Sequence, residues 1–440
     1  MDLCGKALPP KAATLLGSNT LLLVFCVPCV LALHSLNAAH ASAAQFTATL
    51  VKLAAIGLFC QAVFYYAELY NLRIAREARE QTWRIFGAIG IVMLVLAAAF
   101  ALIPSLNPGR DAILGLPLAS LLVLLVTRQI AVVSRPAKVA LIGPEESCKS
   151  LAETIRAYPE WNLKVAATFR PDEIDHSIAD HLVDRVIMCT DMHPDPTALE
   201  RLIDLKLSGL RVESAAQFCE KATGRIDLAH IDPMWFVLSN GFDNNRHKLL
   251  AKRCFDLAGA TVLLILTLPL MLLATLAIAV EGKGPLLYRQ KRVGRHGRFF
   301  EILKFRTMVP VSSGAKPQWT ADSDRRITPL GRFMRTFRID ELPQLFNVLM
   351  GEMSLVGPRP EQPYFCDLLA KEIPFYHQRH TVPPGLTGWA QVRFRYGASI
   401  EESKKKLEYD LFYVKNLSMW LDIAIAFETL KVVLIGKGAK

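Results

Sequence analysis

The chain has 440 residues, of which 52% are hydrophobic, and its formal net charge at pH 7 is +11. A mean hydropathy of +0.27 is high for a soluble protein, so we expect membrane segments within a chain long enough for two or three domains. The nine cysteines are scattered, which excludes a disulfide framework and predicts a reducing compartment for most of the mass, while the positive charge suits anionic lipid headgroups, phosphate-rich substrates or nucleic acid.

Four apolar segments near the N-terminus are long enough to span a bilayer: 19–36, 46–69, 85–104 and 112–133. Basic residues lie before the first segment, between the second and third, and after the fourth: Lys6, Lys11, Arg73, Arg76, Arg79, Arg84, Arg128, Arg135 and Lys138. The two other connecting loops hold almost nothing basic except Arg110. The positive-inside rule therefore predicts a four-helix transmembrane bundle, residues 1–135, with both termini in the cytoplasm.

The start of the chain has two features that suggest other structures. Lys6 and Lys11 ahead of an apolar stretch resemble a signal peptide, but no convincing cleavage site follows, so we expect a membrane anchor. Cys26 and Cys29 have CxxC spacing inside an apolar run that lacks a second ligand pair. We interpret them as buried hydrophobic residues and not as metal ligands.

The composition changes at about residue 136. "AKVALIGPEE" predicts a buried strand that ends in a turn, "SCKSLAETIRAYP" predicts a helix, and the stretches up to about 240 continue this alternation. Alternation of this kind predicts a small parallel α/β module of Rossmann-like shape, residues 136–247. Gly143 stands alone where G-x-G-x-x-G would be expected, so a dinucleotide site and a structural or oligomerising role both remain open.

A fifth apolar segment, 255–280, has Pro269 at its centre. One interpretation is a spanning helix with a proline kink, which membranes tolerate. However, basic residues flank both ends, whereas a spanning helix should carry them mainly on its cytoplasmic side. Because proline removes a backbone donor and bends a helix, we favour a re-entrant helix that returns to the same face and keeps residues 281–440 in the cytoplasm.

The stretch "RTFRIDELPQLFN" places Asp340 and Glu341 next to several arginines. An ordinary helix start would explain it, with Asp340 as the cap and Pro343 in the first turn. Helix N-termini also attract phosphate, and the basic residues Lys304, Arg335 and Arg359 lie in three separate segments beside glycine, proline or a strand end. Such groups can converge on a diphosphate.

Adjacent acids at a helix start project in different directions, so the two carboxylates can have separate roles. One of them could attack phosphorus as a nucleophile. Mg²⁺, which prefers carboxylate and phosphate oxygens, could offset the repulsion between this anion and a diphosphate.

From Lys252 to the C-terminus the chain resembles the bacterial sugar transferases, also called monotopic phosphoglycosyl transferases or polyprenyl-phosphate glycosyl-1-phosphate transferases. The stretches that carry the resemblance are "KRCFDLAGA", "GPLLYRQKRVGRHGRFFEILKFRTM", "RITPLGRFMRTFRIDELPQLFNVLMGEMSLVGPRP", "PGLTGWAQV" and "YDLFYVKN". The preceding membrane helices and Rossmann-like module resemble the long-form members that prime exopolysaccharide or O-antigen synthesis.

The resemblance implies transfer of sugar 1-phosphate from a UDP-sugar to undecaprenyl phosphate, giving undecaprenyl-diphosphate-sugar and UMP through a phosphosugar-enzyme. It implies that Asp340 is the nucleophile and a magnesium ligand, that Glu341 is its partner, and that Lys304, Arg335 and Arg359 lie near the phosphates. It also implies the re-entrant helix, although small members break this helix at Ser-Pro where this chain has Leu268-Pro269.

The expected architecture is therefore a membrane α plus α/β protein with a cytoplasmic α/β catalytic domain at 248–440, in the bacterial inner membrane. Expected partners are the two substrates and membrane lipids, with no nucleic acid, and long-form relatives make a homodimer reasonable. A nucleotide-sugar oxidoreductase or epimerase and a non-catalytic scaffold of a polysaccharide assembly complex are the alternatives. The sequence does not identify the sugar.

Overall fold

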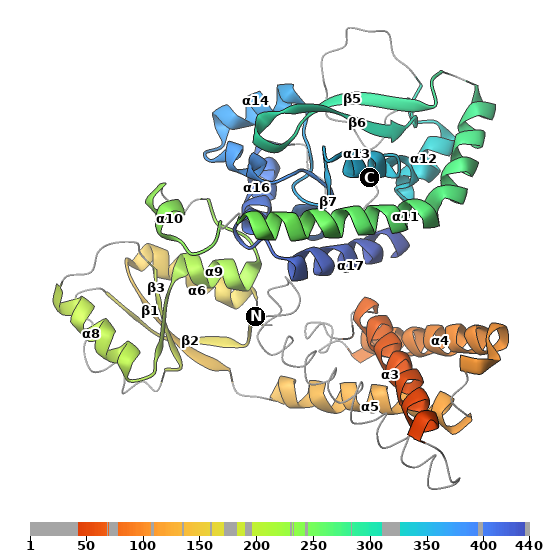
Figure 1. Cartoon of the computed structure of the whole chain (residues 1–440). Helices are drawn as coiled ribbons and strands as arrows, with labels where there is room; N and C mark the ends of the chain where they lie inside the picture. Colours follow the sequence, from red (N-terminus) through yellow and green to blue (C-terminus); the bar gives the residue numbers. More distant parts are fainter. Residues whose placement is uncertain are drawn as a thin grey trace. The chain divides into compact units, whose positions relative to one another are not determined.

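The computed structural model describes most of the chain, in the ranges 43–67, 69, 78–106, 110–133, 136–158, 161–170, 183–189, 196–228, 231, 233–242, 245–282, 284–309, 326–394 and 399–435. The chain divides into two compact units, the first ending at Phe218 and the second beginning at Cys219 (Figure 1). The predicted domain limits at 135 and 247 remain predictions.

Apolar helices form the first part of the N-terminal unit: α3 (Ala43–Tyr66), α4 (Ala78–Leu102), the short η3 (Pro104–Leu106) and α5 (Arg110–Val133). The stretches Thr47–Tyr66 and Trp83–Leu102 are long and apolar enough to cross a membrane, and α5 contains the shorter apolar stretch Pro117–Thr127. Large apolar side chains on these helices, such as Trp83 and Leu94, are exposed, as expected for surfaces that meet lipid. The predicted segment 19–36, with Cys26 and Cys29, lies outside the described residues.

The second part of this unit is the predicted parallel α/β module. Its elements are β1 (Ala137–Ile142), α6 (Glu145–Ala157), β2 (Leu163–Phe169), β3 (Arg185–Met188), α8 (Pro196–Leu207), β4 (Arg211–Ser214) and α9 (Ala215–Thr223), of which α9 continues into the second unit. The strands form one sheet in the order β2-β1-β3-β4, and every pair is parallel. Four residues of the central strand β1 are fully buried, as expected for a strand covered on both faces.

The C-terminal unit contains the remaining elements. They are α10 (Pro233–Leu238), α11 (Arg246–Glu281), β5 (Leu287–Val293), η5 (Arg295–Gly297), β6 (Phe299–Phe305), α12 (Pro329–Thr336), η6 (Ile339–Glu341), α13 (Gln344–Met350), β7 (Ser354–Val356), α14 (Pro363–Glu372), η7 (Tyr376–Thr381), β8 (Gly385–Thr387), α15 (Trp389–Arg393), α16 (Ile400–Lys415) and α17 (Met419–Ile435). β5 and β6 form an antiparallel hairpin, and β7 pairs with β8 in parallel. Helices therefore dominate this α/β unit.

The chain before α11 packs onto this unit. The indole nitrogen of Trp389 donates to the carbonyl of Gly224 at 2.7 Å, and the backbone nitrogen of Phe242 donates to the carbonyl of Lys415 at 3.1 Å. Lys415 also forms an ion pair with Glu220 at 2.6 Å. Residues 219–242 are therefore part of the C-terminal fold.

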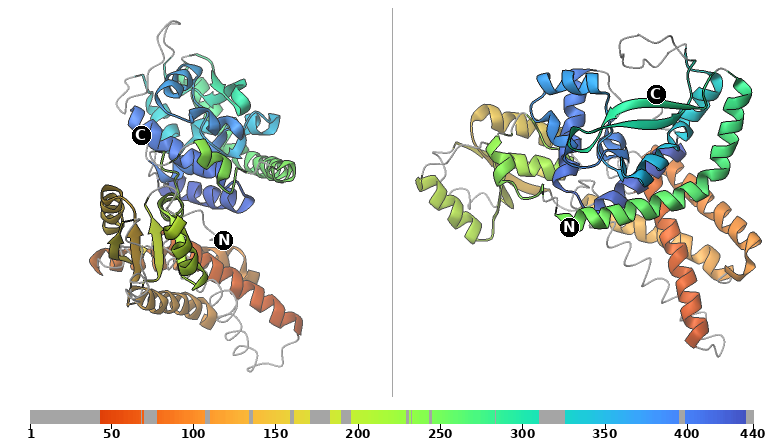
Figure 2. Two further views of the ribbon diagram at one scale, coloured as in Figure 1. Left: turned by 90° about the vertical axis from the view of Figure 1, so that its left-hand side faces the viewer. Right: turned by 45° about the horizontal axis from the view of Figure 1, so that its top comes forward.

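Helix α11 contains the predicted re-entrant segment. It is 36 residues long and remains helical past Pro269, so the predicted break is a bend and not an interruption. The bend is visible in Figures 1 and 2, where the last part of α11 turns away from the line of its first part. Pro269 has no backbone N–H, so one carbonyl in the preceding turn lacks its usual donor. The Thr267 hydroxyl donates to the carbonyl of Leu263 at 2.7 Å. Both features are known causes of helix bending.

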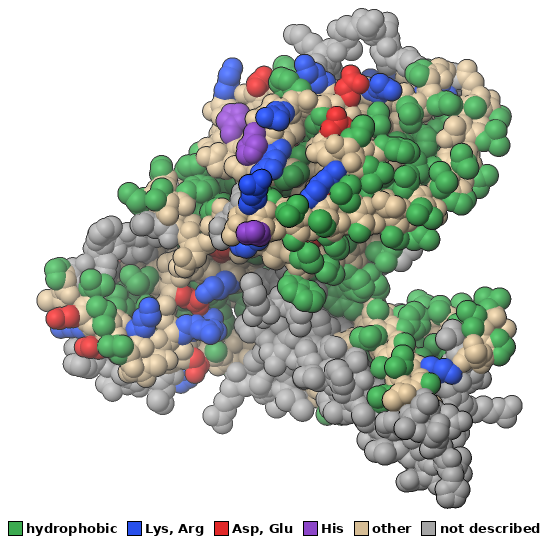
Figure 3. Space-filling view, in the orientation of Figure 1, with side chains coloured by type: hydrophobic (Ala, Val, Ile, Leu, Met, Phe, Trp, Pro, Cys, Tyr) green, Lys and Arg blue, Asp and Glu red, His purple; other side chains and the backbone are tan. Residues whose placement is uncertain are grey.

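Both ends of α11 are fixed to the same unit. Near its start, the Lys252 ammonium forms an ion pair with Asp422 at 2.7 Å, and near its end the carbonyl of Ile278 accepts a hydrogen bond from Arg306 at 3.2 Å. Between these points α11 exposes a series of large apolar side chains: Val262, Ile265, Leu266, Leu268, Leu272, Leu273 and Leu276. Figure 3 shows apolar side chains gathered over this part of the surface.

Candidate active site

The predicted acidic pair lies in the short turn η6, between α12 and α13. Asp340 and Glu341 are 8% and 7% exposed, and the next helix begins at Gln344. No side chain caps that helix, because Pro343 occupies the N-cap position. The interpretation of Asp340 as a helix cap is therefore wrong, since η6 lies ahead of the helix and directs the carboxylates elsewhere.

Backbone strain accompanies this turn. Arg338, directly before η6, has φ 53° and ψ 26°, a left-handed conformation that is uncommon for residues other than glycine. Strained residues persist where the surrounding structure determines them, and they cluster at functional sites. Close packing also fixes α12, because a Cβ at Gly331 would overlap the carbonyl oxygen of Thr307.

Glu341 is bound by three cationic side chains. Its Oε1 accepts from Lys304 at 2.9 Å and from Arg359 at 2.9 Å, and its Oε2 accepts from Arg338 at 3.2 Å. Burial opposes ionisation of this carboxyl, but the three cations outweigh it and hold its pKa well below the ordinary value. Glu341 is therefore an ionised anchor that brings three cations to one point.

Asp340 has a different environment. Among the described residues, no side chain donates a hydrogen bond to its carboxylate or forms an ion pair with it. Burial and the adjacent charge of Glu341 raise its pKa to about 6, against the opposing charges of Lys304, Arg335 and Arg359. The two neighbouring acids thus have different environments, and their separate roles stay a prediction.

The predicted basic residues are brought together at the acidic pair. Lys304 lies on β6 and Arg359 lies in the loop after β7, and both contact Glu341 directly. Arg335, on α12, donates its Nε to the Thr307 hydroxyl at 3.0 Å, and its charge acts on Asp340. Sequence reasoning missed the contacts of Arg338 and Thr307, although "RTFRIDEL" contains Arg338, three residues before Glu341, and "KFRTM" contains Thr307.

The described residues contain no group of three or more His, Cys, Asp or Glu side chains arranged to hold a metal ion. A Mg²⁺ ion does not need such a group, because it commonly takes one or two carboxylates together with substrate phosphates and water. The carboxylate of Asp340, which no side chain in the described ranges binds, fits that requirement. Glu341 fits less well, since cations already contact both of its oxygens.

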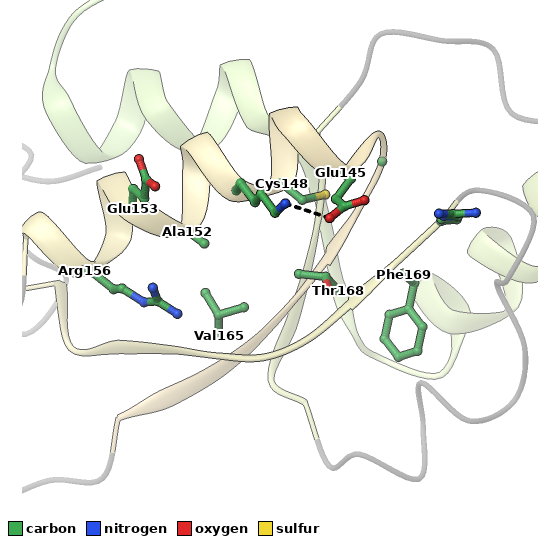
Figure 4. Close-up of a pocket in the computed structure, with 11 residues that line it drawn as sticks. Glu145, Cys148, Ala152, Glu153, Arg156, Val165, Thr168 and Phe169 are labelled. Carbon is green, nitrogen blue, oxygen red and sulfur yellow. Dashed lines mark ion pairs between the residues drawn. The ribbon is translucent and has the colours of Figure 1, made fainter.

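The α/β module has a separate pocket of about 350 Å³ between α6 and β2 (Figure 4). Gly143, the single glycine at which the sequence allows a dinucleotide site, is one of the residues that line it. Glu145, in the first turn of α6, lines the pocket and pairs with Lys149 at 2.7 Å. In a Rossmann site the pyrophosphate lies at this helix start, so a carboxylate there would repel it. The pocket therefore favours the structural interpretation of the module.

The part of the chain that contains the acidic pair is similar to known proteins. Residues 247–436 match the family model described as bacterial sugar transferase. A UDP-N-acetylgalactosamine-undecaprenyl-phosphate N-acetylgalactosaminephosphotransferase of Aeromonas hydrophila is 42% identical over 241 residues, covering 53% of this chain and 55% of that protein. An undecaprenyl-phosphate glucose phosphotransferase of Komagataeibacter xylinus is 42% identical over 197 residues, covering 43% of this chain and 37% of that protein.

A third relative matches over a longer region. A UDP-glucose:undecaprenyl-phosphate glucose-1-phosphate transferase of Klebsiella pneumoniae is 31% identical over 325 residues, which cover 69% of each chain. The chain thus spans about half or less of the first two relatives and about two thirds of the third. With the acidic pair and its cations inside the matched region, these similarities show that the chain belongs to the bacterial sugar transferase family.

Proposed function

We propose that the protein transfers a sugar 1-phosphate from a UDP-sugar to undecaprenyl phosphate, giving undecaprenyl-diphosphate-sugar and UMP. The observation that carries the proposal is the division of roles at the acidic pair. Glu341 is ionised and bound by Lys304, Arg338 and Arg359, whereas no side chain among the described residues binds the carboxylate of Asp340 beside it. The names of the three relatives, which act on undecaprenyl phosphate, support the same acceptor here.

The chemistry takes two displacements at phosphorus. The Asp340 carboxylate attacks the phosphorus that carries the sugar, the bond to the UMP oxygen breaks, and a phosphosugar ester forms on Asp340. A phosphate oxygen of undecaprenyl phosphate then attacks the same phosphorus, which releases Asp340 and forms the new diphosphate. No oxidant or further reactant is needed, and the enzyme returns to its starting state.

The cations give the substrate a place to bind. Lys304 and Arg359 converge on one oxygen of Glu341, and Arg335 acts on Asp340 from α12. A diphosphate that approaches Asp340 therefore meets positive charge that is already in place, which stabilises negative charge developing on the phosphate oxygens. Asp340 is the residue that would hold Mg²⁺ together with these phosphates, and the ion would supply further neutralisation of their charge.

The contacts of α11 support a re-entrant course through the membrane. A straight helix of 36 residues is about 54 Å long, enough to cross a bilayer with a hydrocarbon core of about 30 Å. Its two ends nevertheless bind one folded unit, through Lys252 at the start and the carbonyl of Ile278 near the end. We therefore propose that α11 enters and leaves on the cytoplasmic face of the inner membrane and keeps the catalytic unit there.

Two alternatives have less support. A scaffold protein would not need a buried carboxylate that no described side chain binds beside three converging cations, because burying an acid without a partner destabilises the fold. A nucleotide-sugar oxidoreductase acting through the α/β module would need a dinucleotide site, and Glu145 stands at the helix start where the pyrophosphate would bind. A homodimer remains a prediction.

UMP release tests the proposed function directly. The purified full-length protein would be incubated with Mg²⁺, undecaprenyl phosphate and a panel of UDP-sugars that includes glucose, galactose and N-acetylgalactosamine. We expect release with at least one donor, dependent on the acceptor under multiple turnover. Absence of release with every donor would refute the proposal.

A further inference from the structure

Hydrogen bonds to its carbonyl groups fix the backbone of the loop that carries Arg359. Three consecutive carbonyl groups accept hydrogen bonds: that of Arg359 from the Arg379 guanidinium at 2.8 Å, that of Pro360 from Arg292 at 3.0 Å, and that of Glu361 from the backbone nitrogen of Val293 at 3.0 Å. Glu361 itself forms ion pairs with Arg292 and Lys406. Because three successive carbonyls are held by separate donors, the direction of the backbone at Arg359 is fixed by the fold.

The preceding residues are fixed as well. The carbonyl of Val356 accepts from Lys252 at 2.9 Å and from the Tyr413 hydroxyl at 2.9 Å. The Gly357 nitrogen donates to the carbonyl of Thr387 at 2.9 Å, and a Cβ at Gly357 would overlap the carbonyl oxygen of Pro383. The loop therefore enters the site at a defined angle from β7.

Arg379 is a deeply buried member of the groups that hold this loop. It is 3% exposed, pairs with Asp410 at 2.8 Å, and donates to the Tyr376 hydroxyl at 2.8 Å as well as to the carbonyl of Arg359. Asp410 is 1% exposed. Removing two such charges from water is costly, and a buried ion pair is weak evidence for stability, so a role in fixing geometry is the better explanation.

We propose that Arg379, held by Asp410, is a positioning residue for the phosphosugar transfer. Through the carbonyl of Arg359 it sets the direction in which the Arg359 guanidinium reaches Glu341 and the substrate phosphates. Arg379 itself does not touch substrate. The inference rests on the proposed function, because it assigns a role in that same site.

A double-mutant cycle tests this role on the full-length protein. Arg379→Lys keeps the charge but loses the planar fork that bonds several partners at once. We expect kcat for UMP release to fall about tenfold, as for the loss of one hydrogen bond to a charged group, while the thermal midpoint changes by less than about 4 °C. In an Arg359→Ala background the same substitution should have no further effect on kcat, because the side chain that it positions is absent.

Arg225→Lys is the matched control. Arg225 pairs at 3.2 Å with Glu408, two residues before Asp410 on the same helix, and it does not hold the Arg359 loop. This control should leave kcat unchanged in both backgrounds. It separates a general loss of helix packing from an effect that passes through Arg359.

Two results would overturn the inference: an unchanged kcat in Arg379→Lys, or the same fractional loss with and without Arg359. If Arg379→Lys does not fold, Tyr376→Phe, which removes only one partner of the guanidinium, is measured in the same cycle. We then expect kcat for UMP release to fall roughly threefold, and only in the background that retains Arg359. An unchanged kcat would refute the positioning role of Arg379. Failure of the wild-type protein to release UMP would refute the proposed function, and the inference with it.

Discussion

Replacing Glu361 by glutamine should destabilise the Arg359 loop by an amount that depends on pH. Burial disfavours the charge of Glu361, but Lys406, Arg379 and Arg292 outweigh burial and lower its pKa from 4.5 to about 2. A pKa difference of about 2.5 corresponds to about 3 kcal/mol of stabilisation at pH 7. Because the folded pKa lies below the unfolded one, this stabilisation is complete above about pH 4.5 and is lost as the pH falls toward 2.

Hydrogen exchange measures this effect where it arises. The backbone nitrogen of Val293 donates to the carbonyl of Glu361, so peptides covering β5 report opening of the contact. We expect the opening free energy to differ between wild type and Glu361→Gln by about 3 kcal/mol at pH 7 and by about 1.4 kcal/mol at pH 3. The two proteins should converge further below pH 3, because a protonated glutamate is neutral like glutamine.

The control for this prediction is Glu301→Gln. Glu301 pairs with Arg289 at 3.8 Å on the same hairpin, but both side chains are more than 60% exposed. The variant should differ from wild type by less than about 0.5 kcal/mol at either pH. A difference between wild type and Glu361→Gln that stays constant from pH 7 to pH 3 would show that the carboxylate charge does not stabilise the loop.

Two further predictions concern the site and the membrane. Lys304→Ala removes one of the three cations on Glu341 and should lower kcat for UMP release about a hundredfold, whereas an unchanged rate would place Lys304 outside the phosphate site. Cysteines introduced at Leu250, in the first turns of α11, and at Gln290, on β5 after its end, should both react with a membrane-impermeant thiol reagent only when it reaches the cytoplasmic face. Labelling from opposite faces would mean that α11 spans the membrane.

Local sequence patterns predicted most of the fold. The hydrophobic runs 46–69, 85–104 and 112–133 correspond to α3, α4 and α5, because a stretch of about 20 apolar residues leaves few alternatives to a membrane helix. The strand and helix alternation after residue 136 likewise predicted the parallel sheet. The packing of residues 219–242 onto the catalytic unit was not predictable, since it depends on distant partners such as Trp389.

The site was predictable in its members but not in their arrangement. Asp340, Glu341, Lys304 and Arg359 stand in short motifs, and the structure brings them together. The motifs do not reveal that Glu341 binds the cations while no described side chain binds Asp340, because that division depends on a turn with Arg338 at positive φ. The hydrogen bond from Arg379 to the carbonyl of Arg359 was not predicted either, since the two residues are 20 positions apart and share no sequence motif.

The central claim is that Asp340 becomes the phosphosugar ester, and mass spectrometry of the trapped enzyme tests it most directly. The full-length protein would be incubated with Mg²⁺ and its UDP-sugar donor, without undecaprenyl phosphate, and then digested. We predict that the peptide containing Asp340 gains the mass of one sugar phosphate and that Asp340→Asn, which remains folded, gains none. An adduct on a different residue, or an adduct that persists in Asp340→Asn, would contradict the account.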